Sequence, residues 1–380
     1  MDFALNEEQL AVFEMARSFS NDNIAPHAIK WDETGHFPVD VIKQAGQLGM
    51  AGIYIKEDVG GSALSRLDAT LIFEALAYGC PSIGSFISIH NMCSWMIDQF
   101  GSEQQRQKWL PKLTSMELIC SYCLTEPGSG SDAAALTTKA EFEGNGWKLN
   151  GSKTFISGGN TSDLYLTMAR TGGEGPKGVS AILVENPSEG LSFGANEKKM
   201  GWRAQPTSLV QFDDCKVPAD HLIGEEGKGF SYAMAGLDGG RLNIAASALG
   251  AAQCALDKTL QYMKERKAFG KSISEFQALQ FRIADMETEL AAARVFLRQA
   301  AWKVDTGASD KTKYCAMAKR FVTDIAFDVA NQALQLHGGY GYLSDYGIEK
   351  IVRDLRVHQI LEGTNEIMRV IIARQMLSES

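Results

Sequence analysis

The spacing of hydrophobic and polar positions changes twice along the 380 residues. Up to residue 117, apolar residues recur every three or four positions, which predicts amphipathic helices. From 118 to 225 they fall in short alternating runs separated by Gly, Pro, Asn and Asp, which is typical of β-strands. From 226 onward the helical period returns. The pattern predicts a mainly α-helical protein with a central β-domain, divided into domains 1–117, 118–225 and 226–380.

Local signals refine these three parts. Asn6 followed by Glu7, Glu8 and Gln9 predicts a capped helix start, and the apolar run 82–101 predicts a buried helix. Asn145-Gly146 lies inside an alternating run and predicts a two-residue hairpin, so we expect a small antiparallel β-barrel. Four long amphipathic runs follow and predict a C-terminal four-helix bundle; they span 229–266, 275–304, 311–339 and 348–377.

Charge and composition exclude several classes of protein. The formal net charge of -9 and the pI near 5.3 argue against a nucleic-acid partner, which requires a basic surface. The segment "MDFALNEEQL" has no basic or apolar signal region, and no run is long enough to span a membrane. We therefore expect a soluble cytoplasmic protein of bacterial type, with a mature mitochondrial matrix form as the alternative.

The seven cysteines are scattered and odd in number, which indicates free thiols. Cys120 and Cys123 form a CxxC, but no second pair exists to complete a zinc site, and the run around them resembles a strand. The six histidines form no HxxxH pair. We expect no metal site, and we expect His358 to be packed or exposed rather than catalytic.

Four stretches carry candidate chemistry. The first, "YCLTEPGSGSD", contains Gly128-Ser129-Gly130 in the form GxGxxA, but a hairpin follows instead of the long helix that a Rossmann unit requires. Its bare amides fit either an anion-binding loop or an ordinary surface turn. Arg266, at a helix end, fits either a phosphate clamp or a solvated cap. The glycine-rich "LQLHGGYGYL" fits either close approach of a ligand or a long turn.

The fourth stretch is "RVHQILEGTNEIMRV", in which Glu362 stands in an apolar helical run just before Gly363. Burial would raise the pKa of this carboxyl toward neutrality, which suits a general base. An exposed glutamate at a turn is the alternative interpretation.

These stretches, with "DGGR" at 238–241 and "FQ" at 276–277, occur in the order and spacing of the acyl-CoA dehydrogenases, and the resemblance covers essentially the whole chain. "SIHNMCSWMIDQFG" and "RTGGEGPKGVS" resemble the subgroup of that family that oxidises isobutyryl-CoA. The resemblance implies FAD as cofactor, conversion of isobutyryl-CoA to methacrylyl-CoA in valine degradation, electron-transfer flavoprotein as acceptor and a homotetramer. Butyryl-CoA and 2-methylbutyryl-CoA remain possible substrates. A helical scaffold that binds CoA without catalysis is the alternative of a different class.

The resemblance also assigns residues, with Glu362 as the catalytic base. It implies that FAD is bound by Tyr122, Cys123, Leu124, Thr125, Glu126, Pro127, Gly128, Ser129, Gly130, Ser131, Phe155, Ile156, Ser157, Arg266, Phe276, Gln277, Gln335, Leu336, His337, Gly338, Gly339, Thr364, Asn365 and Glu366. Part of this set would reach the flavin of a neighbouring subunit. It implies that acyl-CoA is bound by Ser131, Lys177, Asp238, Gly239, Gly240, Arg241 and Arg374.

Overall fold

The computed structural model describes residues 4–378, so the outermost ends of the first and last predicted domains lie outside it. Helices form the first part, as predicted. They are α1 (Glu7–Phe19), α2 (Ala28–Thr34), α3 (Val39–Gln47), α4 (Arg66–Gly79), α5 (Pro81–Phe100) and α6 (Glu103–Thr114). The predicted capping box is confirmed, because the Asn6 side chain accepts from the amide of Gln9 and the Gln9 side chain accepts from that of Asn6. Helix α5 is buried along most of its length, as its apolar pattern predicted.

The middle part is an eight-stranded sheet with the order β6-β7-β3-β2-β4-β5-β8, and β1 pairs with β4. The strands are β1 (Cys120–Cys123), β2 (Lys139–Glu143), β3 (Gly146–Ser157), β4 (Leu164–Arg170), β5 (Val179–Glu185), β6 (Leu191–Phe193), β7 (Thr207–Pro218) and β8 (Leu222–Ile223). The sheet is mixed, whereas we expected a wholly antiparallel one, because β1 and β2 both run parallel to β4.

The predicted hairpin exists, but its turn is displaced by one residue. Glu143 pairs with Gly146, so Gly144 and Asn145 are the two turn residues. Gly144 has φ +64°, and a positive φ at the first turn position is the type II′ pattern that glycine favours. The prediction placed the turn at Asn145-Gly146 because Asn-Gly is the commoner signal.

The last part contains α7 (Gly229–Glu265), α8 (Gln277–Asp305), α9 (Lys311–His337), α10 (Ile348–Arg356) and α11 (Asn365–Ser378). A short hairpin of β9 (Lys267–Ala268) and β10 (Lys271–Ser272) joins α7 to α8. The first three predicted long helices are present. The fourth is not continuous, because the chain leaves the helix after α10 and resumes it at α11. Glu362 lies in this break rather than within a helical run.

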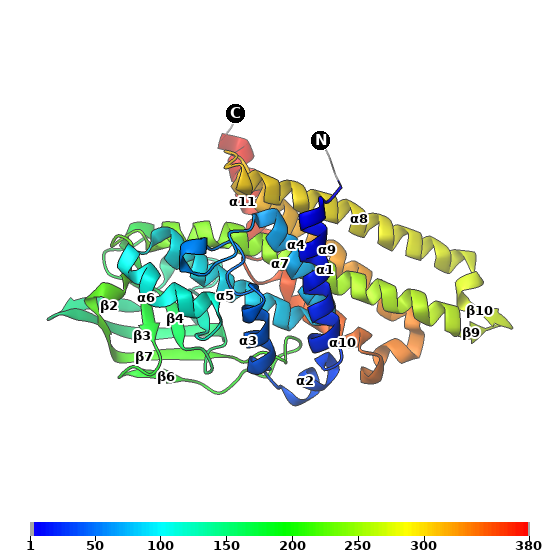
Figure 1. Ribbon diagram of the computed structural model, residues 1–380, viewed down its shortest axis with the longest axis horizontal. Helices are drawn as coiled ribbons and strands as arrows, with labels where there is room; N and C mark the ends of the chain where they lie inside the picture. The colour runs from blue at the N-terminus through cyan, green and yellow to red at the C-terminus, as the bar shows by residue number, and fades with distance from the viewer. Residues whose placement is uncertain (1–3, 379–380) are drawn as a thin grey trace.

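The helical parts share one core, the sheet has a core of its own, and a third cluster lies where α5, α6 and α7 pack on the sheet. In Figure 1 the sheet lies at one end and α7, α8 and α9 extend toward the β9–β10 hairpin at the other. Helix α7 approaches α4 closely, since a Cβ on Gly250 would lie 1.9 Å from the carbonyl oxygen of Glu74. Within residues 4–378, no helix is long and apolar enough to cross a membrane.

Candidate active site

Glu362 occupies a sharp turn between η9 (Val357–Gln359) and α11. Its own φ is +56° and that of Gly363 is +87°. A left-handed conformation is strained for a glutamate and natural for a glycine. Two successive left-handed residues reverse the chain and turn the Glu362 side chain inward between α7, α9 and β1.

One oxygen of the Glu362 carboxylate is buried and has no hydrogen-bond partner among the described residues. Part of the side chain remains accessible, but Oε2 is buried and receives no hydrogen bond from any described residue. Burial raises the pKa of Glu362 to about 7, against the opposing attraction of Arg241 and Lys319. A carboxylate with this proton affinity suits a general base that works near neutral pH.

The two adjacent glycines of the "DGGR" stretch on α7 make room on two sides. A Cβ on Gly240 would lie 2.7 Å from Glu362 Oε2, and one on Gly239 would lie 2.4 Å from an Arg66 guanidinium nitrogen. Arg241 donates to Asp238 at 2.6 Å, and Thr312 donates to the other Asp238 oxygen. The structure therefore brings Gly240 and Arg241 close to Glu362.

Tyr122 and Cys93 face the same carboxylate from β1 and α5. The Tyr122 hydroxyl is buried and has no partner within the described chain. Burial, and secondarily the nearby Glu362, raises the pKa of Tyr122 well above its ordinary value. Burial also raises the pKa of the Cys93 thiol, with Glu362 a smaller contributor, so Cys93 stays protonated and inert here.

The loop after β1 is anchored to the protein interior on one side and borders open space on the other. The carboxylate of Glu126 accepts hydrogen bonds from Lys153 Nζ at 2.7 Å and from the amides of Thr137 and Thr138. Its side chain is therefore engaged within the protein. Gly128 and Gly130 have nothing within 4 Å of an added Cβ. Their bare amides therefore border free space, which fits a bound group that lies against the backbone.

Phe155 borders the same region from the end of β3. The amide of Thr154 donates to the carbonyl of Thr125 at 2.9 Å, which links the loop to this strand. Phe155 has φ +59° and is 67% exposed, although it is a large apolar ring. An exposed ring on strained backbone beside an open glycine loop fits an aromatic cofactor ring. Ile156 beside it is buried, and Ser157 is half-buried.

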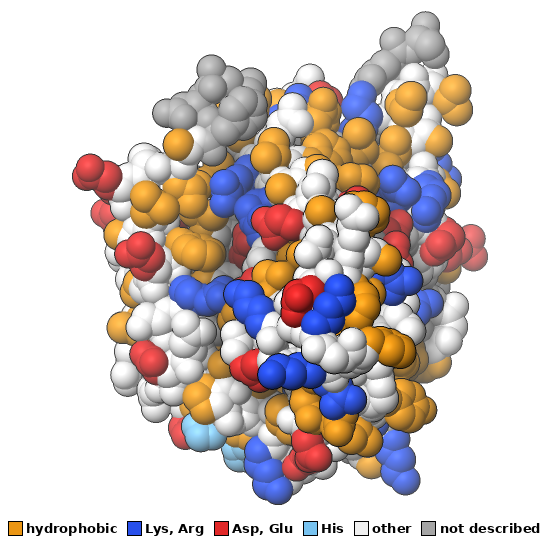
Figure 2. Space-filling view, turned by 90° about the vertical axis from the view of Figure 1, so that its right-hand side faces the viewer, with side chains coloured by type: hydrophobic (Ala, Val, Ile, Leu, Met, Phe, Trp, Pro, Cys, Tyr) orange, Lys and Arg blue, Asp and Glu red, His pale blue; other side chains and the backbone are white. Residues whose placement is uncertain are grey.

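The other predicted cofactor residues gather at the far end of the bundle. Arg266 lies 5.2 Å from the ring of Tyr340, and Tyr262 stacks on His337 with ring centroids 4.4 Å apart. Gln335, Gly338 and Gly339 are exposed there, whereas Leu336 is buried; Phe276 and Gln277 begin α8 beside the hairpin. Figure 2 shows this end of the molecule, where basic and apolar side chains intermingle.

This second group is remote from Glu362. Arg266 follows Gly240 by 26 residues of α7 and its cap, which is about 39 Å at the helical rise of 1.5 Å per residue. The predicted cofactor residues of one chain therefore form two separate groups, or candidate half-sites.

The remaining predicted residues are placed as follows. Thr364 accepts from the amide of Ile367, and Asn365 is buried and donates to Thr323 and Asp324. Ser131, Pro127, Glu366, Lys177 and Arg374 are exposed, whereas Cys123 and Leu124 are buried and Thr125 is half-buried. His358 is buried with one ring nitrogen at the carbonyl of Ile244, so of the two expected placements, packed or exposed, it is packed.

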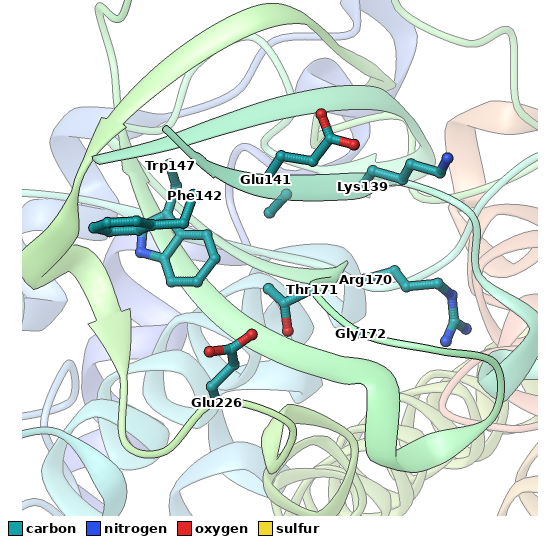
Figure 3. Close-up of a pocket in the computed structure, with 9 residues that line it drawn as sticks. Lys139, Glu141, Phe142, Trp147, Arg170, Thr171, Gly172 and Glu226 are labelled. Carbon is teal, nitrogen blue, oxygen red and sulfur yellow. The ribbon is translucent and has the colours of Figure 1, made fainter. Parts of the chain in front are cut away.

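A hollow of about 700 Å³ in the sheet lies apart from these residues. Figure 3 shows Lys139 and Glu141 on one side of it and Arg170, Thr171 and Glu226 on the other. The Arg170 guanidinium donates hydrogen bonds to four backbone carbonyls, including those of Gly173 and Gly175 in the loop that carries Lys177. The hollow contains none of the candidate catalytic residues, and its wall supports the Lys177 loop. Among the described residues, no cluster could hold a metal ion.

Two buried lysines that contact candidate site residues were missed by the sequence analysis. Lys153 pairs with Glu126, and Lys319 donates to the backbone beside Glu362. Each lysine stands where the local apolar pattern calls for a core residue, in "GSKTFIS" and "AMAKRFV". A lysine at a core position was the available signal.

Comparison with known proteins agrees with this geometry. The models for the N-terminal, middle and C-terminal domains of acyl-CoA dehydrogenases match residues 6–117, 121–215 and 227–377. The chain belongs to the acyl-CoA dehydrogenase family. These enzymes are FAD-dependent oxidoreductases, and the open glycine loop with Phe155 fits that cofactor.

Its relatives include two named mitochondrial isobutyryl-CoA dehydrogenases. The protein from Bos taurus is 52% identical over 99% of this chain and 90% of its own length. That from Dictyostelium discoideum is 54% identical over 98% of this chain and 90% of its own. The structure of butyryl-CoA dehydrogenase from Megasphaera elsdenii, 37% identical, superimposes with a TM-score of 0.96 over 99% of this chain and all of that one.

Proposed function

We propose that this chain oxidises a short branched-chain acyl-CoA to its 2,3-enoyl-CoA, with isobutyryl-CoA as substrate and methacrylyl-CoA as product. The observation that carries the proposal is the Glu362 carboxylate, which is turned inward with Oε2 buried and without a hydrogen-bond partner in the part of the chain that the structure describes. The names of the two relatives at 52% and 54% identity support the choice of substrate.

Glu362 is the proposed base that removes the proton from the carbon next to the thioester. FAD, when bound, would supply the acceptor for the hydride of the β-carbon, so the substrate loses one proton to the carboxylate and one hydride, a proton with two electrons, to the flavin. The α-proton of a thioester is too weakly acidic for a solvated carboxylate. The protein therefore has to exclude water and place hydrogen-bond donors at the carbonyl where charge develops.

The cofactor would be held by the loop Tyr122–Ser131, by Phe155, Ile156 and Ser157, and by Thr364. Arg241, Asp238, Ser131, Lys177 and Arg374 are the residues proposed to contact acyl-CoA. Asn365 and Glu126 would act indirectly, since their side chains bind other parts of this chain.

The half-site at Arg266, Phe276, Gln277 and residues 335–339 would serve the flavin of a second copy, since it lies about 39 Å along α7 from Gly240. We therefore propose a homo-oligomer, with the homotetramer as the expected form. Electron-transfer flavoprotein is the proposed acceptor. The compartment is the one expected from the sequence, the cytoplasm or a mitochondrial matrix.

Anaerobic mixing with acyl-CoA tests the proposal. The purified protein should be yellow, and isobutyryl-CoA should bleach its flavin absorbance within the mixing time of a manual experiment. A colourless protein that binds CoA would support the non-catalytic scaffold instead. Steady-state rates with an artificial acceptor over isobutyryl-, 2-methylbutyryl- and butyryl-CoA then rank the substrates. A pocket distinguishes one methylene by only about 1–3 kcal/mol, so the ratio of kcat/KM values decides.

A further inference from the structure

Lys319 lies on the face of α9 that packs into the core. Its neighbours one helical turn away, Cys315 and Val322, are fully buried, and the Lys319 side chain itself is 0% exposed. A fully buried lysine is rare unless its ammonium group is paired, because removal of a charge from water is costly. The reason for this lysine therefore has to lie in its contacts.

The ammonium of Lys319 binds the turn that carries Glu362. Nζ donates to the carbonyl oxygen of Gly363 at 2.8 Å and to Oδ1 of Asn365 at 2.8 Å. Asn365 is fixed in turn by its own donation to Asp324 at 2.7 Å. Lys319 thus anchors the backbone immediately after Glu362 by hydrogen bonds, at the point where two left-handed residues reverse the chain.

The Lys319 ammonium group also lies near several ionisable side chains. Around it are Glu362, Arg241 from α7, Asp324 on its own helix and Glu366 from α11, while the buried His358 stays neutral nearby. Glu362 is faced by Lys319, Arg241, Tyr122 and Cys93. Burial lowers the pKa of Lys319 to about 7, opposed by the attraction of Glu362. At pH values below 7 the cation is present, and it favours the ionised carboxylate.

We propose that Lys319 is a positioning residue for the base: it holds the Glu362 turn in its left-handed conformation and its charge sets the proton affinity of the carboxylate. This inference rests on the proposed function of Glu362. It assigns Lys319 no contact with substrate or cofactor.

The test compares the pH dependence of kcat/KM for isobutyryl-CoA in holoenzymes. Lys319→Met removes both the hydrogen bonds and the charge, and Lys319→Gln removes the charge but retains a donor. The ascending limb of the kcat/KM profile, where activity rises with pH, reports ionisation of the base. Without the cation it should move to higher pH by about one unit in both variants, as expected for the loss of a neighbouring opposite charge. In Lys319→Met, kcat at the optimum should also fall at least tenfold with little change in KM, because the turn loses its anchor.

Lys350→Met is the matched control. Lys350 is also a buried lysine paired within its helix, to Asp354 at 2.6 Å, but its second contact is the sulfur of Cys80 rather than the turn that carries Glu362. Its loss should lower the melting temperature and leave the ascending limb where it is in the wild type.

The outcomes distinguish a positioning role of Lys319 from a purely structural one, and both from failure of the proposed function. If wild type oxidises isobutyryl-CoA but both Lys319 variants keep its ascending limb, the inference is overturned and Lys319 is only structural. If Lys319→Met does not fold, the limb of Lys319→Gln decides in the same way. If wild type itself oxidises no acyl-CoA, the proposed function fails, which is a different result.

Discussion

The Glu362 carboxylate occupies the space that a side chain on Gly240 would fill. A Cβ at position 240 would lie 2.7 Å from Oε2 and 3.1 Å from the sulfur of Met92. Contacts under 3.0 Å force a shift, and here the carboxylate has to move since the α7 backbone is held within the core. The glycine therefore sets where the proposed base can stand.

Gly240→Ala should accordingly lower kcat/KM by at least a hundredfold, because a misplacement of about 1 Å can cost that much. The helix itself gains about 1 kcal/mol from alanine over glycine, which offsets part of the 1–3 kcal/mol cost of overpacking. We expect a melting temperature within a few degrees of wild type and an unchanged flavin content. Steady-state kinetics with thermal unfolding checks this, and wild-type activity would show that the space is not needed.

Glu362 should make the protein less stable as pH rises. The folded-state pKa, about 7, exceeds the unfolded value of 4.5, so the unfolded chain ionises first. The penalty is absent below pH 4.5, grows between 4.5 and 7, and is complete above 7. It amounts to about 3 kcal/mol at 1.36 kcal/mol per pH unit.

Glu362→Gln removes that penalty and isolates it. Relative to wild type, the variant should gain stability as pH rises from 5 to 8 and show almost no difference near pH 4.5. Turnover should fall by about a thousandfold or more, since an amide cannot accept the proton. Denaturant unfolding at several pH values measures the first effect. A constant difference across this range would mean that Glu362 is not desolvated.

Sequence patterns predicted the family and its motif stretches but not the local geometry of those stretches. The "DGGR" and "EGTNEIMR" stretches were recognised from their order, and the structure supplies the steric reason for Gly240. Periodicity placed Glu362 in a helix, because an apolar run of that length continues on both sides of it. The left-handed φ at Glu362 arises from tertiary contacts such as Lys319 to Gly363, which are remote in sequence and invisible to a local pattern.

In the β-domain, too, local patterns predicted the elements but not the contacts between distant segments. Alternation identified the strands, yet parallel pairing of β1 with β4 depends on how distant segments meet. The buried pair Lys153–Glu126 joins residues 27 apart, so although Lys153 stands at a core position of its strand, nothing near it in sequence identifies its partner. Long-range charge pairs of this kind cannot be obtained from a window of neighbouring residues.

Lys153→Met should loosen the open glycine loop. The substitution leaves the Glu126 carboxylate buried without its cation, which typically costs about 3–5 kcal/mol. Lys153 also donates to the carbonyl of Leu124 within the loop, so that FAD retention should fall at least tenfold. Flavin fluorescence after dilution and thermal unfolding measure the two effects.

The Glu126 pair also predicts acid sensitivity. The interactions with Lys153 and with the donors around Thr137 and Thr138, acting against burial, lower the pKa of Glu126 to about 2. Its stabilisation is therefore present above the unfolded pKa of 4.5 and is lost as pH falls through about 2. In Lys153→Met, stability should decline at a higher pH than in wild type. Identical acid transitions would show that the pair is not coupled to folding.

The distance between the two half-sites leads to a complementation experiment. If Arg266 serves the flavin of a neighbouring subunit, each complete site combines Glu362 of one chain with Arg266 of another. Arg266→Ala and Glu362→Gln homo-oligomers should each be nearly inactive, the first through weak FAD binding and the second through loss of the base. Co-expression of the two should form hybrids in which one site has both native residues, so that activity returns well above the sum of the parents. A co-expressed pair that stays as inactive as its parents would place Arg266 and Glu362 in service of the same chain's site, against the separation of about 39 Å along α7.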